Sequence, residues 1–281
     1  MDKLLELLNK EKKQTLVNQP NISINEDGCY NVFLNVTSDE EIKINISKGK
    51  DVTIYEYINY CNNVKVNYNL NLEENSKLTV ISLYSSKNCK PVINAKTNIC
   101  ENAYCSSMKL FLFGSEIEYT SNTLLLGKKA NINDYNVVIN NSGLIQKYVM
   151  NCIHENVETT SQMRNYVICK GSSTINIDTN GHIKQGMKES NISQKTKGIL
   201  LSLESGISAN PLLLIDEYDC LASHGAGIGA IDEEDLFYLM SRGLTREESE
   251  ELIIGGFVNP IYKAYPEEIK EYIIEIVSKY L

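Results

Sequence analysis

Several patterns that mark common protein classes are missing from this sequence. Its eight cysteines form no CxxC pair, so their spacing indicates neither a zinc site nor the disulfide framework of a secreted protein. Lysine and arginine form no basic run, and 27 basic against 36 acidic residues give a net charge of −9, which argues against nucleic acid as the main partner. The phosphate-binding motif GxxxxGKS/T is absent, so we expect no nucleotide site in this chain.

Long apolar runs are missing as well. Residues 1–20 contain neither the apolar core nor the small-residue cleavage site of a secretory signal, and no run reaches membrane-spanning length. We therefore predict a cytoplasmic protein without a membrane span. The chain has 281 residues, of which 42% are apolar, and this is enough for one large all-β domain or two ordinary ones.

An alternating pattern of apolar residues dominates the chain from about residue 21 to residue 219. Ile42, Ile44 and Ile46 show the period of two, and the continuous run 212–215 is typical of a buried strand. Signals for tight hairpins are scarce, which disfavours a meander or a sandwich because those folds need repeated reversals. No strict repeat is visible, so the pattern by itself leaves a sandwich, a barrel and a β-helix open.

Helical patterns lie on both sides of this β block. The expected helices are 2–17, 232–241, 245–255 and 266–279. The first has one apolar face, which would close the end of the β block or bind a partner. Asp232 is expected to cap the second helix and Gly243 to stop it.

The third helix is predicted to begin at a capping box and to end at a pair of glycines. Thr245 and Glu248 have the spacing of the box, and Gly255-Gly256 supplies the stop signal. The fourth helix has a single apolar stripe. This stripe is expected to pack against the two preceding helices.

Cys220 and His224 are the only pair of soft metal ligands at close spacing. In an extended chain residues 220, 222 and 224 face the same side, so thiolate and imidazole could converge on one metal or sulfur species. The alternative is a buried cysteine beside a histidine that is hydrogen-bonded near a turn. Cys152 and His154 form a similar pair for which a structural role is at least as good an explanation, and His182 has no ligand type nearby.

Four short motifs near the C-terminus occur together. They are Ser223-His224-Gly225-Ala226, the acidic segment containing Leu236-Phe237-Tyr238, then Ser241-Arg242-Gly243, and finally Gly256-Phe257. In this combination the chain resembles the SufB/SufD family of iron–sulfur cluster assembly scaffolds, with weaker similarity back to about residue 154. The resemblance implies an all-β core in the form of a right-handed parallel β-helix. It divides the chain into an N-terminal helix at 1–20, a β-helix core at 21–229 and a C-terminal helical subdomain at 230–281.

The resemblance also implies a chemical role for His224. This residue matches a SufD-type histidine that takes part in cluster assembly at the interface between two SufB/SufD-type chains, and it is the expected metal ligand. Cys220 would stand in for a family cysteine at the position of Ala222. SufB-type chains have a glutamate after the histidine, where this chain has Gly225, and a sulfur-accepting cysteine upstream, which is absent here. The chain therefore resembles SufD more than SufB.

The partners implied by the resemblance are an ATPase and a second scaffold chain. A SufC-like ABC ATPase would dock on the helices at 232–241 and 245–255, and ATP would bind only to that partner. The residues expected at this contact are Asp232, Leu236, Phe237, Tyr238, Arg242, Glu248 and Phe257. The β-helix would pair with a SufB-like subunit or with a second copy of this chain. A transient iron–sulfur cluster would form at that interface, with sulfur arriving indirectly from a donor.

We thus expect a scaffold subunit rather than an enzyme. One alternative is a purely structural SufD-like paralogue that provides no cluster ligands. Another is a β-helix carbohydrate-active enzyme, which would need clustered carboxylates in a groove and usually a secretion signal. The sequence contains neither feature.

Overall fold

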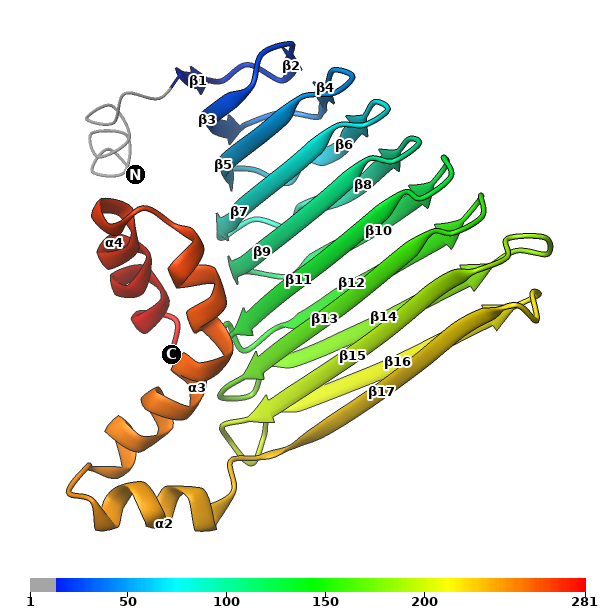
Figure 1. Ribbon diagram of the computed structural model, residues 1–281. Helices are drawn as coiled ribbons and strands as arrows, with labels where there is room; N and C mark the ends of the chain where they lie inside the picture. The colour runs from blue at the N-terminus through cyan, green and yellow to red at the C-terminus, as the bar shows by residue number, and fades with distance from the viewer. Residues whose placement is uncertain (1–13) are drawn as a thin grey trace.

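The computed structural model describes residues 14–281, and these form a solenoid of parallel strands followed by three helices (Figure 1). Successive strands alternate between two sheets, so that the odd-numbered strands form a nine-stranded sheet and the even-numbered strands an eight-stranded sheet. Each strand pairs in parallel with the strand two places along the chain. The β-helix architecture implied by the family resemblance is confirmed.

The nine-stranded sheet contains β1 (Gln14–Val17), β3 (Gly28–Val36), β5 (Asp51–Tyr60), β7 (Lys77–Lys87), β9 (Tyr104–Gly114), β11 (Asn131–Asn140), β13 (Thr160–Cys169), β15 (Ser190–Leu200) and β17 (Cys220–Ala230). The eight-stranded sheet contains β2 (Asn21–Ile24), β4 (Glu40–Ile46), β6 (Lys65–Leu72), β8 (Val92–Ile99), β10 (Ile117–Leu125), β12 (Ile145–His154), β14 (Thr174–Ile183) and β16 (Gly206–Ile215). The helices are α2 (Glu233–Ser241), α3 (Arg246–Ala264) and α4 (Glu267–Ser278).

One corner of the solenoid repeats a left-handed backbone residue in successive turns. Asn75, Asn102 and Lys129 have φ angles of 57°, 54° and 58°, and each backbone amide donates to a carbonyl of the following turn. The same corner is occupied by Gly49 before them and by Glu158 and Glu189 after them, with spacings of 26, 27, 27, 29 and 31 residues along the series. The turns lengthen along the chain, which explains why the sequence shows no strict repeat.

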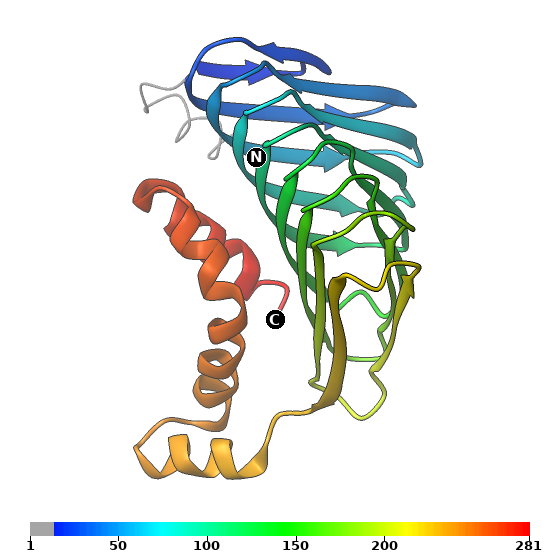
Figure 2. The ribbon, with the colours of Figure 1, turned by 45° about the vertical axis from the view of Figure 1, so that its right-hand side comes forward.

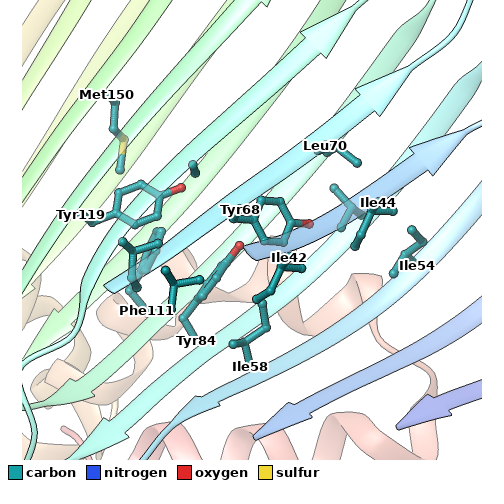
Figure 3. Packing of buried hydrophobic residues seen from close by; sticks show 14 of the residues in the cluster. Ile42, Ile44, Ile54, Ile58, Tyr68, Leu70, Tyr84, Phe111, Tyr119 and Met150 are labelled. Atoms are coloured by element: carbon teal, nitrogen blue, oxygen red, sulfur yellow. The ribbon is translucent and has the colours of Figure 1, made fainter. Parts of the chain in front are cut away.

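The space between the two sheets is filled by apolar side chains from both. Figure 3 shows part of this core, in which Ile42 and Ile44 of β4 and Met150 of β12 are labelled. Aromatic rings occupy its middle, where Phe111 lies 5.0 Å from both Tyr84 and Tyr119 between ring centroids. Side chains alternate between the two faces of each strand, so the period of two in the sequence becomes one wall of this core.

A row of buried polar side chains runs along the inside of the nine-stranded sheet. The strand register aligns Glu56, Ser82, Lys109, Asn136, Asn165 and Thr196. Ser82 Oγ and Tyr68 Oη donate to the carboxylate of Glu56 at 2.7 and 2.9 Å. Burial raises the pKa of Glu56, and these two hydrogen bonds oppose that shift. These polar side chains form hydrogen bonds with one another and with Tyr68, so the row places polar groups in the core whose hydrogen-bonding capacity is used.

The outer face of the nine-stranded sheet is covered in part by the helices, which lie along one side of the solenoid (Figure 2). Ile254, Val258 and Ile261 of α3 are buried there, together with the stripe Ile269, Ile273 and Val277 of α4. The stripe therefore packs in the same apolar cluster as the sheet residues Leu110 and Val137. No helix between residues 14 and 281 is long and apolar enough to cross a membrane.

The predicted N-terminal helix at 2–17 lies mostly on residues 1–13, outside the described residues. Its last four residues form β1 instead and pair with β3 from Tyr30 to Phe33, so this part of the prediction is wrong. The free edge of β3 supplies backbone hydrogen bonds. Two of the four residues, Thr15 and Val17, are β-branched and favour a strand.

The predicted starts of the three C-terminal helices are confirmed, but the predicted C-terminal end of α3 is wrong. Asp232 caps α2, and Gly243 follows that helix with a φ of 98°. The capping box at Thr245 opens α3, but the helix continues through both glycines and through Pro260 to Ala264. Burying its three apolar side chains, at about 1.5–3 kcal/mol each, offsets about 1 kcal/mol per glycine and about 3 kcal/mol for the proline.

Gly256→Ala tests whether α3 is continuous at this point. A Cβ at Gly256 would meet no atom within 4 Å, and alanine is the better helix former. We expect the free energy of unfolding to rise by about 0.5–1 kcal/mol in urea titrations. Gly243→Ala, at a left-handed position, should lower it. A loss of stability in Gly256→Ala would mean that the helix ends at residue 255.

His154 has a structural position inside the solenoid. Its side chain is fully buried, with Nδ1 2.7 Å from Thr159 Oγ1 and Nε2 2.8 Å from Ser161 Oγ. Burial, and to a lesser degree the charge of His182, lowers the pKa of His154 to about 4. The imidazole is therefore neutral in the folded protein at neutral pH.

This histidine should make the protein less stable in weak acid. Above pH 6.5 it is neutral in both states. Below pH 6.5 the imidazole binds a proton in the unfolded chain, whereas in the folded chain it does so only near pH 4. The free energy of unfolding therefore decreases as the pH is lowered from 6.5 to 4. Between pH 7 and pH 5 the native chain should lose about 2 kcal/mol more than His154→Gln in urea titrations. Equal losses in the two proteins would contradict the burial of a neutral His154. The control is His224→Gln, which removes an exposed imidazole on another strand.

Candidate functional site

The open end of the solenoid is the most exposed part of the β structure. β17 is the last strand of the nine-stranded sheet and β16 the last of the eight-stranded sheet, so each has a strand neighbour on one side only. Ten of the eleven residues of β17 are exposed, whereas β13 in the middle of the sheet is mostly buried. The backbone groups along the outer edge of β17 are therefore available for pairing with another strand.

The strand register identifies which side chains of β17 face inward. Cys220, Ala222 and His224 are aligned with Ser190, Ile192 and Gln194 of β15, and those three residues are buried in the solenoid. Because neighbouring residues in register share a face, the two candidate ligands belong to the last, uncovered layer of the core. The prediction that residues 220, 222 and 224 share one face of an extended segment is confirmed, whereas the alternative of a histidine near a turn is wrong, because His224 lies within a regular strand.

Cys220 and His224 differ in their surroundings. Cys220 is half-buried, and its Sγ donates to the backbone oxygen of Glu217 at 3.1 Å. Burial raises the pKa of this thiol, and the charges of Glu217 and Asp219 add to the shift. His224 is exposed, and no side-chain hydrogen bond to it is present among residues 14–281. The imidazole is therefore available to coordinate a metal ion, whereas the surroundings of Cys220 favour the protonated thiol over the thiolate that binds metals.

The two residues do not converge on one ion. Both lie in the same extended strand, where four residues span about 13 Å. That separation is several times the length of a metal–ligand bond. Within residues 14–281 no group of three or more His, Cys, Asp and Glu residues could hold a metal ion. Any complete coordination shell at this end therefore requires ligands from outside the described chain.

Exposed apolar side chains lie on the last two strands at this end, and we refer to Leu212, Leu214, Leu221 and Ile228 as the apolar rim. Leu212 and Leu214 are each 49% exposed and Leu221 is 68% exposed. The run 212–215 was predicted to be a buried strand. It does form the end of β16, so the strand is confirmed, but Leu212, Leu214 and Ile215 are exposed and the predicted burial is wrong. A continuous apolar run is typical of a strand covered on both faces, and β16 has no covering element on its outer face in the structure. The apolar run 212–215 was thus the sequence signal for an exposed apolar surface on β16.

The residues expected to bind the ATPase fall into two groups. Four of them have roles within the chain. Asp232 Oδ1 accepts from Glu234 N at 2.8 Å, and Glu248 Oε2 accepts from Thr245 N at 2.8 Å, so both are helix caps. Leu236 is buried, and the ring of Phe257 packs 5.3 Å from that of Tyr166 between centroids. The caps and packing of α2 and α3 thus account for these four residues.

The other group forms an exposed surface on α2. Phe237 is 75% exposed, and Tyr238 and Arg242 lie beside it with the guanidinium 5.3 Å above the tyrosine ring. Met240 on α2 and Leu252 on α3 are exposed as well, although the sequence did not single them out. The sequence signal for this surface was the consecutive apolar run 236–240, because apolar residues at every position of a helix cannot all lie on one packed face.

Comparison with known proteins gives consistent results. A family model described as SUF system FeS cluster assembly, SufBD core domain, matches residues 31–257. The iron-sulfur cluster assembly protein SufD of Bacillus subtilis is 31% identical over 144 residues, which are 51% of this chain and 33% of that protein. A SufBD family protein of Pyrococcus horikoshii is 45% identical over 91 residues, 30% of this chain and 19% of the relative. A SufBD family protein of Staphylococcus epidermidis is 28% identical over 155 residues, 55% of this chain and 33% of the relative.

The aligned region is thus at most 33% of the length of these three relatives. The family model nevertheless covers most of the chain, from β3 to the middle of α3. It includes the solenoid from β3 onward, the open end with His224, and the exposed surface of α2. This chain therefore belongs to the SufBD family of the SUF system for iron–sulfur cluster assembly.

Proposed function

We propose that this chain is a scaffold subunit that helps to build and transfer iron–sulfur clusters in a SUF-type assembly complex, without catalytic activity of its own. The observation that carries the proposal is the uncovered last layer, which presents His224 on a strand with a free backbone edge. Membership of the SufBD family supports the same role. Iron and sulfur are the cargo of this site, and Cys220 is a secondary ligand candidate.

In this proposal the solenoid pairs with a second SufB/SufD-type chain through β17. An exposed edge strand can be extended by a strand of another chain, and the apolar rim would then be buried. Leu212, Leu214 and Leu221 make the rim unusual for a surface that stays in water. The partner would also provide the ligands that His224 lacks, so the cluster would form transiently at the interface.

A SufC-like ABC ATPase is the proposed second partner, and it docks on the exposed surface of α2. Phe237 and Met240 are three residues apart and share one side of the helix. Aromatic and methionine side chains are enriched at protein interfaces. The chain has no phosphate-binding motif, so ATP hydrolysis belongs to the partner in this proposal.

His224→Ala should abolish cluster formation by the complex, because a neutral imidazole is a good iron ligand and nothing nearby replaces it. Cys220→Ala should have a smaller effect, since the thiol is held protonated and hydrogen-bonded to Glu217. The measurement is anaerobic reconstitution of the complex with iron and sulfide, followed by visible absorption.

Ser223→Ala is the matched control, since Ser223 lies on the same strand but faces outward, where its Oγ is 3.3 Å from Ser193 Oγ. Native mass spectrometry shows whether each variant complex is intact. A full cluster yield from His224→Ala in an intact complex would leave this subunit the role of a structural paralogue without cluster ligands.

Replacing Phe237 and Met240 together by serine should weaken binding to the SufC-like ATPase by about tenfold or more, because exposed aromatic anchors contribute most to such contacts. Isothermal titration calorimetry measures the effect. Ile274→Ser on α4 is the control, because Ile274 is also exposed but lies away from α2. Equal affinities for the double variant and the control would place the docking site elsewhere.

A further inference from the structure

Three exposed cations lie on the outer face of the nine-stranded sheet, close to its open edge. Arg164 of β13 is in register with Lys195 of β15, and Lys197 lies two residues further along the same face. None of the three forms an ion pair with a carboxylate in residues 14–281, although many other lysines do, such as Lys184 with Glu155 at 2.6 Å. Lys197 Nζ instead lies 5.7 Å from the centroid of the Phe257 ring. We refer to Arg164, Lys195 and Lys197 as the cationic patch.

This patch is unusual for the chain that carries it. The net charge is −9, so acidic residues are in excess over the whole sequence. The neighbouring outward positions on β13 and β15 are Gln162, Tyr166 and Ser193, none of which is acidic. Three neighbouring positive charges repel one another, and that cost is removed when carboxylates from a partner lie among them.

Glycines connect the cationic patch to the free edge of the sheet. Lys195 is in register with Gly225 and Lys197 with Gly227. A Cβ at either glycine would meet no atom within 4 Å, so no side chain stands between the lysines and the edge. Strands are about 4.8 Å apart, and an extended lysine side chain is longer than that. The ammonium groups of Lys195 and Lys197 can therefore reach over β17 to whatever pairs with it, while Arg164 adds positive charge behind them.

We propose that the cationic patch is an electrostatic docking surface for carboxylate side chains on the edge strand of the SufB-type chain that pairs with β17. The inference rests on the pairing described under the proposed function. It adds the charge that this partner carries beside its edge strand.

A second copy of this chain does not fit the patch. The sequence from Cys220 to Ala230 contains no acidic residue, and the acids nearest to this strand are Asp219 and Asp232 at its two ends. In a symmetric antiparallel pairing centred on Gly225 those acids would lie about 20 Å from the centre along the strand. Two copies would instead bring their cationic patches close together. The complementary partner carries aspartate or glutamate on the outward side of its edge strand.

The test compares charge variants of the full chain. Lys195→Glu and Lys197→Glu are combined in one variant, and Lys195→Gln with Lys197→Gln in a second. The matched control combines Lys65→Glu and Lys96→Glu, two exposed lysines of the eight-stranded sheet that are far from β17. The probe is the full-length SufB-type chain of the same organism. Its affinity is measured by calorimetry at low and high salt, and sedimentation velocity measures self-association of each variant.

The glutamate variant should bind the probe about tenfold or more weakly than the native chain at low salt, and the glutamine variant should be intermediate. The difference should shrink at high salt, and the control should bind like the native chain. Equal binding by the glutamate variant and the control would overturn the proposal. A native chain that forms a stable dimer with itself, unaffected by the lysine variants, would overturn it as well.

The outcome also separates this inference from the proposed function. If the native chain binds the probe but the lysine variants do so equally well, pairing stands and the docking surface is wrong. If the native chain binds no probe at any salt concentration, the pairing itself fails, and the docking surface fails with it. The reconstitution experiment with His224→Ala tests cluster formation and is independent of both binding outcomes.

Discussion

The backbone hydrogen bonds between successive turns are the interaction on which the rest of the structure depends. Every strand from β3 to β15 in the nine-stranded sheet has a parallel neighbour on both sides, and each left-handed corner residue donates to the next turn. A parallel ladder of this kind does not close on itself, so its last strand keeps unpaired backbone groups. The open end at β17 thus follows from the fold itself. The candidate ligands, the apolar rim and the cationic patch all lie at or beside that end.

Much of the architecture could be predicted from the sequence, because local patterns determined it. The alternation in β4, the cap at Asp232 and the capping box at Thr245 are local features, and each has the predicted form. The choice of a parallel β-helix over a sandwich came from the family resemblance, since alternation is common to both folds. Turn lengths that increase from 26 to 31 residues hide the repeat from inspection of the sequence.

Predictions failed where distant contacts decide the local structure. The glycine pair in α3 has the composition of a helix end, but the apolar residues around it are buried against the solenoid and extend the helix. Residues Gln14–Val17 follow a helical pattern and yet pair with β3. In both cases the decisive partner is far away in the sequence, and no window of neighbouring residues contains it.

The candidate site was found from the sequence only in part. Cys220 and His224 were identified, but their separation of about 13 Å along one strand depends on β17 being regular throughout. Whether an apolar residue is buried or exposed depends on the face of the solenoid on which it lies. Leu212 and Leu214 are exposed because they lie on the outer face of β16, which no element of residues 14–281 covers. The alignment of Arg164 with Lys195 joins residues on different strands, which the sequence alone does not bring together.

The direction of stacking has a consequence for synthesis of the chain. Ile22 and Ile24 of β2 are buried, whereas the inward positions of β17 are largely exposed. Stacked repeats interact mainly with their nearest neighbours, so each turn can be added to the turn before it as the chain leaves the ribosome. The edge at β17 is therefore synthesised after the turns on which it stacks. A chain still attached to the ribosome exposes this edge only once those turns are present.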